Sequence, residues 1–222
     1  MSYSIKEVGV KLDKWMKFVK DIKYDLLIPP LGLECSKMTP KQAKENFNWF
    51  ISKIPERMEY FRKRCSSDMN IDIEKLDFST QSFLHVWTWF LKTAQVEKTP
   101  KNEVEKMKVK YAQFGDTWIE YERFSVATEY ILRDIAMYLG QAFLHLGDFI
   151  TWSYVTKPKN LIHVNSPILV GFVDNRYDPP FRPQFDPIGA VRGQALKLLS
   201  KEVKETDLLD IFTKWTEYIP RS

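Results

Sequence analysis

Hydrophobic residues in the first two-thirds of the chain recur at intervals of three and four, which is the spacing of an amphipathic helix. The sequence Ser4-Ile-Lys-Glu7 has the form of a capping box, in which two side chains satisfy free backbone amides at a helix start. It predicts a first helix of about twenty residues that stops before Pro29-Pro30. Thr39-Pro40 predicts the start of a second helix, which we expect Pro55 to kink or restart.

The middle of the chain contains a charged stretch followed by the strongest helical pattern. Ser79 is expected to cap a third helix, which carries apolar residues as far as Ala94. Residues 97–110 are polar on most sides and predict either a surface helix or a long ordered loop. Residues 124–146 keep apolar positions in helical register, and Gly147 is placed to end that helix in a left-handed conformation. We expect this segment to be the central core helix.

Beyond Gly147 the period of the apolar positions changes from about 3.6 to 2, which indicates strands. Residues 150–155 and 167–173 predict two strands, and residues 161–164 could supply a third. Asp186-Pro187 then predicts a helix start, and a last helix follows near Leu208. The predicted fold is α+β, with a mainly helical N-terminal two-thirds packed on a small C-terminal β-sheet that is followed by two helices.

Length and composition are those of a globular protein with its own core. The chain has 222 residues and is 44% hydrophobic, so it needs no disulfide or metal to fold. We expect a single domain over residues 1–222, with 1–115 and 116–222 as an alternative subdivision into a helical and an α+β part. The start of the chain lacks the pattern of a secretory signal, and no run of 18 apolar residues occurs, so a cytoplasmic protein without membrane contact is expected.

The charge pattern gives little support to a nucleic-acid partner. The formal net charge is +4, but most basic residues alternate with acidic ones, as between Lys101 and Lys110. Such a pattern is typical of a solvated helix face rather than of a phosphate-binding stripe.

Motifs for catalysis, metal binding and nucleotide binding are missing from the sequence. The three histidines, His85, His145 and His163, have no second His or Cys at ligand spacing, and Cys35 and Cys65 are far apart. We therefore expect no metal, no cofactor and no disulfide. An alternative is a small hydrolase or transferase whose site lies between the central helix and the sheet. Its candidate residues are Glu129, Asp134 or His145 with Arg133.

Aromatic side chains are the better candidates for binding. Trp87 and Trp152 fit core positions of a helix and a strand, whereas Trp89 and Tyr154 could face a ligand or a partner. A proline-stiffened loop at residues 174–185 either covers a sheet edge or binds a partner. Its candidate contact residues are Asp174, Arg176, Tyr177, Phe181 and Arg182.

Three short motifs stand out: Trp49-Phe50 with residues 54–57, the segment 76–84 leading to Trp87, and residues 135–140 with Trp152 downstream. Taken together they resemble a group of uncharacterised bacterial cytosolic proteins, whose relatives look similar to proteins encoded beside toxin genes. The chain differs from that pattern in having Gln141 where an acidic residue usually follows the glycine, and Phe83 where leucine is common. The resemblance implies a non-enzymatic immunity or antagonist role.

The leading hypothesis is a non-enzymatic protein-binding module that neutralises a bacterial toxin or effector. Inhibitors of nucleases are often acidic because they imitate nucleic acid, and a pI of about 8.8 does not favour that version. The alternatives are the small hydrolase or transferase and a structural or regulatory protein that dimerises through its first helix.

Overall fold

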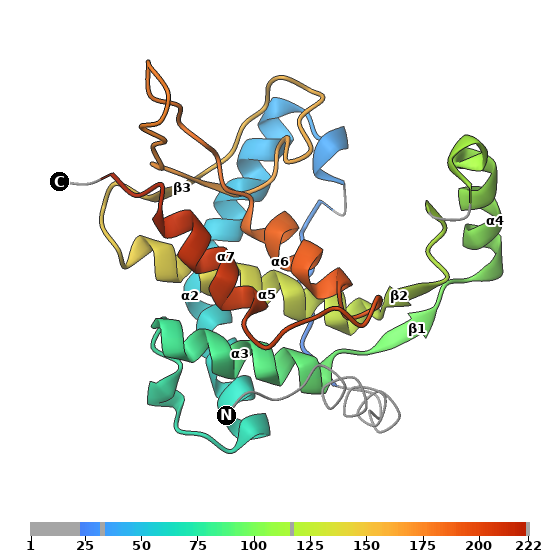
Figure 1. The fold of residues 1–222 in the computed structure, drawn as a ribbon, viewed down its shortest axis with the longest axis horizontal. Coiled ribbons are helices and arrows are strands. Elements are labelled where there is room, and N and C mark those ends of the chain that lie inside the picture. The colour runs from blue at the N-terminus through green and yellow to red at the C-terminus, as the bar shows by residue number, and fades with distance from the viewer. Residues whose placement is uncertain (1–22, 32–33, 116–117, 221–222) are drawn as a thin grey trace.

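The computed structural model describes residues 23–31, 34–115 and 118–220, and it shows an α+β fold (Figure 1). The helix predicted between Ser4 and residue 22 lies outside this part of the chain. Residues 23–28 carry no helix, so the predicted helix does not extend to Leu26 as its apolar spacing suggested. Short 3₁₀ helices are η1 (Cys35–Lys37), η2 (Ile73–Lys75) and η3 (Ala112–Phe114).

Helix α2 (Pro40–Met69) is continuous, so the helix does not restart at Pro55, which was one of the two outcomes predicted there. Thr39 and Gln42 form the predicted type of cap, with Thr39 accepting a hydrogen bond from the Gln42 amide. The buried face of α2 runs from Phe50 to Cys65 on both sides of Pro55. Packing of this face compensates for the backbone hydrogen bond that is lost because proline has no amide hydrogen.

Helix α5 (Val126–Leu144) is the central core helix that the sequence predicted, although it begins after Phe124 and ends before Gly147. Ser125 caps it, and its residues from Ile135 to Gly140 are all buried. It is surrounded by α2, α3 (Thr80–Thr93) and α6 (Pro187–Leu196), while α7 (Asp207–Thr216) packs on α3 and α6 (Figure 1). The predicted caps Ser79 and Asp186 accept hydrogen bonds from the first turns of α3 and α6.

Two antiparallel two-stranded sheets complete the described fold. The sheet predicted after the core helix pairs β3 (Thr151–Ser153) with β4 (Ile168–Val170), and Trp152 lies opposite Leu169. The proposed third strand at 161–164 is instead a run of turns with local hydrogen bonds, as from the Val164 amide to the Leu161 carbonyl.

The other sheet lies inside the stretch predicted to be helical. It pairs β1 (Val96–Lys98) with β2 (Glu122–Phe124), and α4 (Lys101–Lys110) lies between them in sequence. Residues 96–115 and 118–124, which we call the arm, extend away from the other helices (Figure 1). The charged stretch 97–110 is therefore largely a surface helix, preceded by a strand that the sequence analysis missed.

One aromatic cluster fills the interior, and it draws on elements from Tyr24 to Phe212. Phe61, Tyr138 and Trp89 make edge and tilted ring contacts at the centre of this cluster. The alternative boundary at residue 115 falls within the arm. No helix in the described residues is both long and apolar enough to cross a membrane.

Candidate functional site

The loop that follows β4 folds back on itself and presents side chains beside the end of α7. Backbone hydrogen bonds join Asp174 to Phe181 in both directions, at 2.7 and 3.1 Å, and Leu169 of β4 to Phe185. Phe185 is buried in the core and anchors the end of the loop. We call residues 174–182 the binding loop, after the sequence prediction that placed five candidate binding residues in it.

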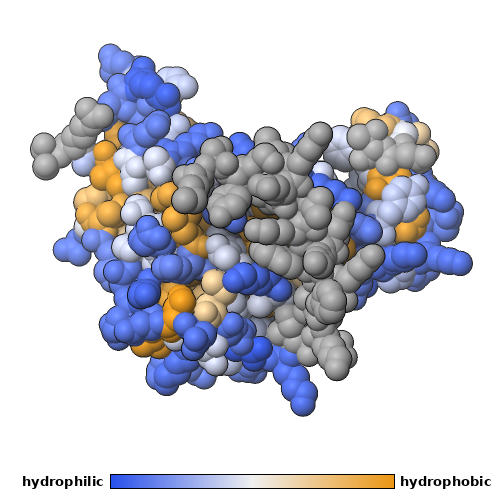
Figure 2. All heavy atoms as spheres, turned by 60° about the horizontal axis from the view of Figure 1, so that its bottom comes forward, coloured by the Kyte–Doolittle hydropathy of each residue, from blue (hydrophilic) through white to orange (hydrophobic). Residues whose placement is uncertain are grey.

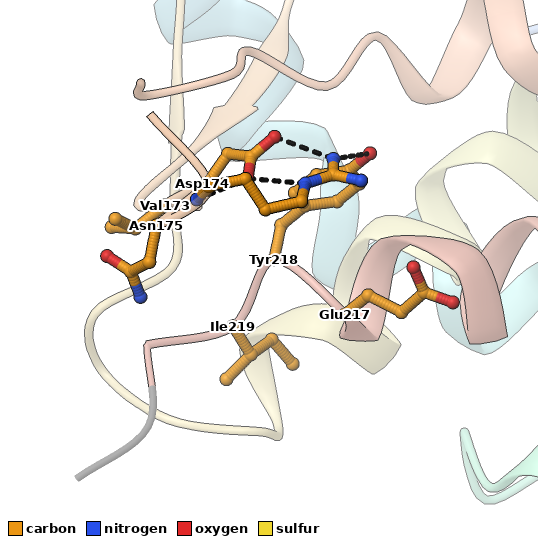
Figure 3. Close-up of a pocket in the computed structure, with 7 residues that line it drawn as sticks. Val173, Asp174, Asn175, Glu217, Tyr218 and Ile219 are labelled. Atoms are coloured by element: carbon orange, nitrogen blue, oxygen red, sulfur yellow. Dashed lines mark hydrogen bonds and ion pairs between the residues drawn. The ribbon is translucent and has the colours of Figure 1, made fainter. Parts of the chain in front are cut away.

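Asp174 and Arg176 hold the start of the binding loop in one conformation. The Arg176 Nε donates to the Asp174 Oδ1 at 2.8 Å, and one terminal nitrogen donates to Oδ2 at 2.6 Å. The same guanidinium donates to the Tyr218 hydroxyl at 3.1 Å (Figure 3). The Val173 amide donates to the Tyr218 carbonyl at 2.7 Å, which fastens the loop to the end of α7.

These residues line an open hollow of about 460 Å³, shown in Figure 3. Its walls come from the loop and from the residues that follow α7. The lining residues are Val173, Asp174, Asn175, Arg176, Glu217, Tyr218 and Ile219.

The electrostatics of the hollow favour a fixed ion pair. The Asp174 side chain is 7% exposed and that of Arg176 is 68% exposed, so the cation faces solvent above its carboxylate. The hydrogen bonds from Arg176 lower the pKa of Asp174. The Asp174 and Tyr218 hydrogen bonds raise the pKa of Arg176. The pair therefore stays ionised at neutral pH and orients a guanidinium edge outward.

Two exposed aromatic residues lie on the same loop as Arg176. Tyr177 and Phe181 are 59% and 57% exposed, and their rings meet edge to face with centroids 6.1 Å apart. Arg182 is exposed beside them. The structure thus brings five of the seven sequence-predicted binding residues into one loop.

The two remaining predicted binding residues lie elsewhere. Trp89 is buried in the core and donates its indole nitrogen to Asp68 at 3.0 Å, so it cannot contact a partner at the surface. Tyr154 is half-buried and its ring packs on Phe47, with centroids 4.9 Å apart. Neither lines the hollow beside the binding loop.

The candidate catalytic residues of the enzyme alternative do not converge on one site. Glu129 is paired with Arg192. His145 is exposed at the other end of α5, about 24 Å along the helix axis from Glu129. Its ring stacks on Phe78. Among the described residues, no three His, Cys, Asp or Glu side chains are grouped so that they could hold a metal ion.

Asp134 instead belongs to a buried network that joins the segment before α2 to α5. Arg57 donates to both Asp134 oxygens, with Nε at 2.8 and 2.9 Å, and the Tyr24 hydroxyl donates to Oδ2 at 2.5 Å. Burial raises the pKa of Tyr24 well above its usual value, and the Asp134 charge adds to that rise. The Arg57 guanidinium also lies 4.4 Å from the Tyr60 ring centroid. All polar atoms of Asp134 are engaged, which indicates a structural role.

Tyr218 and Glu217 were missed as site residues in the sequence analysis. They lie more than 40 positions from Asp174 and reach it only through the packing of α7. No local motif marks them, although the aromatic content of the last helix was visible in the sequence.

Comparison with known proteins adds no identification: no family model matches the chain, and no curated protein or solved structure matches it. The role of the binding loop is therefore argued from its own residues.

Proposed function

We propose that the protein is a protein-binding module that contacts its partner through the binding loop. The finer proposal is an immunity or antagonist protein in a bacterial cytoplasm, whose partner is a toxin or effector other than a nuclease. The immunity role comes from the sequence resemblance, and the exclusion of a nuclease comes from the basic pI.

The observation that carries the proposal is an aromatic pair exposed on a loop that is already ordered. More than half of the Tyr177 side chain and more than half of the Phe181 side chain face water, so both are available for contact with a partner. Tyrosine, arginine and other large side chains supply most of the binding energy at protein interfaces. The Asp174 and Tyr218 contacts fix the loop in advance, which lowers the entropy lost on binding.

Photo-crosslinking tests this proposal directly. A p-benzoylphenylalanine residue at position 177 is expected to capture one protein partner in cells of the native host. The matched control places the same residue at position 162, because Ile162 is 99% exposed and lies outside the binding loop. Capture at neither position, or the same capture at both, would refute the role of the loop.

The captured partner then allows a quantitative test. Tyr177→Ala and Phe181→Ala are each expected to weaken binding by about tenfold or more in calorimetric titration. The unfolding free energy should change little, because both side chains are largely exposed. Ile162→Ala should change neither quantity.

The finer immunity proposal has its own test. If the partner is a toxin, co-expression of the wild-type protein should restore growth, and the Tyr177→Ala Phe181→Ala double variant should restore it less. A captured partner whose expression does not impair growth would refute the immunity role while leaving the binding role intact.

A further inference from the structure

The arm carries a second exposed aromatic surface, separate from the binding loop. Of the large hydrophobic residues that are exposed in the described chain, four fall within 13 positions of the arm. They are Val109 at 81%, Phe114 at 53%, Trp118 at 57% and Tyr121 at 51% exposure. Figure 2 shows hydrophobic side chains at the outer end of the arm, beside hydrophilic ones.

Tyr111, Phe114 and Trp118 form a connected cluster just after α4. The Trp118 ring lies 5.5 Å from Phe114 and 5.9 Å from Tyr111, measured between ring centroids. The Lys110 ammonium lies 4.9 Å from the Tyr111 ring centroid. Exposed apolar side chains that gather in one place on a soluble protein indicate an interaction surface.

The fold does not need these aromatic residues for its own core. Val104 and Ile119 are buried within the arm, but neither belongs to the main buried cluster. The root of the arm is nevertheless firm, because Phe124 is buried in that cluster and the Ser125 amide donates to the Gln95 carbonyl at 2.9 Å. The base of the arm is thus held by the core, and the exposed side chains at its outer end can contact a partner.

The charges on the arm are complementary to those of a second copy of the same arm. On α4, Lys101, Lys106 and Lys110 are exposed and form no ion pair with another described residue. Across the aromatic cluster in sequence, Glu120 and Glu122 are exposed and form no ion pair with another described residue, and Glu122 lies opposite Lys98 in the β1–β2 register. In a two-fold arrangement each surface contacts its own copy, so the lysines of one arm can meet the glutamates of the other.

We propose that two copies of the chain associate through their arms, with aromatic clusters in contact and opposite charges around them. This surface is distinct from the binding loop, so the inference does not depend on the proposed function. Each half-exposed aromatic residue can bury roughly 100 Å², which gives roughly 400 Å² per protomer with Val109 and places the contact among weak interfaces. We therefore expect weak self-association, with a dissociation constant on the order of 100 µM.

Sedimentation velocity of the full chain from about 1 to about 500 µM tests the proposal. The wild type is expected to pass from monomer to dimer over this range, and Trp118→Ala to raise the dissociation constant by about tenfold or more. Ile162→Ala and Tyr177→Ala are the controls and should leave it unchanged. A wild type that stays monomeric throughout, or a dimer that persists in Trp118→Ala, would overturn the arm contact.

Charge reversal identifies the occupant of the arm surface as a second copy. Lys106→Glu Lys110→Glu and Glu120→Lys Glu122→Lys should each weaken self-association, because like charges then face one another. An equimolar mixture of the two variants should form a heterodimer more strongly than either variant forms a homodimer. Two weakened variants that do not recover on mixing would contradict the proposed pairing of lysines with glutamates.

Discussion

At the scale of single residues, Gly140 provides the space that the Trp152 ring occupies. A Cβ atom placed on Gly140 would overlap the six-membered part of that ring. The contact gives a physical reason for a glycine in α5 and a tryptophan in β3, since the Trp152 ring lies directly against the Gly140 backbone.

We expect Gly140→Ala to destabilise the protein by about 1 to 3 kcal/mol, because Trp152 must move in a packed interior. Gly193 is the matched control. It is also helical, and a Cβ atom there would have no heavy atom within 4 Å. Gly193→Ala should therefore stabilise the protein slightly, by about 0.5 to 1 kcal/mol. Urea denaturation measures both changes, and equal effects would refute the packing explanation.

At the scale of elements, the Arg57–Asp134 pair connects α2 to α5 and holds the segment before α2 through Tyr24. Both charged side chains are almost completely buried. Removing one of them would leave the other charge unpaired in the core, which typically costs about 3 to 5 kcal/mol.

We therefore expect Asp134→Leu and Arg57→Met each to destabilise the protein strongly, and the double variant to be less destabilised than the sum of the two. A double-mutant cycle in urea measures this coupling. Glu56→Gln is the control, because it removes an exposed ion pair with Lys53 and leaves both buried side chains in place, so it should have little measurable effect. Additive losses in the cycle would show that the two residues do not act as a pair.

Helix starts were predictable because each depends on a few adjacent residues. Thr39, Ser79 and Asp186 all cap helices where the sequence indicated. The first sheet was missed because β1 and β2 are three residues each and mainly charged, so no alternation is visible. Their pairing depends on Val96 and Phe124 meeting across 28 positions, which local patterns do not encode.

At the scale of the whole molecule, the sequence predicted the α+β class, but it could not place the loop at 174–182 relative to other elements. Asp174 and Arg176 are two positions apart, so their pairing is local, whereas Tyr218 joins them only when α7 packs on the core. Trp89 shows the reverse case. Its helical position left open whether it faced outward, and the contacts of α3 with other elements bury it.

Two buried ionisable groups in the core also make the stability of the whole molecule fall with rising pH in the alkaline range. Burial raises the pKa of the Cys65 thiol from 9.0 to about 12 and that of Tyr138 from 10.0 to about 12. Above about pH 9 the unfolded chain loses these protons while the folded chain keeps them, so the unfolded state binds fewer protons. Stability that is fully present below pH 9 is therefore lost progressively as the pH rises towards 12.

For Cys65 alone this linkage predicts a loss of about 2 kcal/mol in unfolding free energy between pH 8 and pH 10.5. Cys65→Ala removes the thiol and with it this contribution. Between pH 8 and pH 10.5 the unfolding free energy of the variant should therefore decrease by about 2 kcal/mol less than that of the wild type. Cys35→Ala is the matched cysteine variant, because Cys35 is only half-buried and lies outside the core. Equal pH slopes in the wild type and Cys65→Ala would mean that the thiol loses its proton equally easily in the folded and unfolded chain.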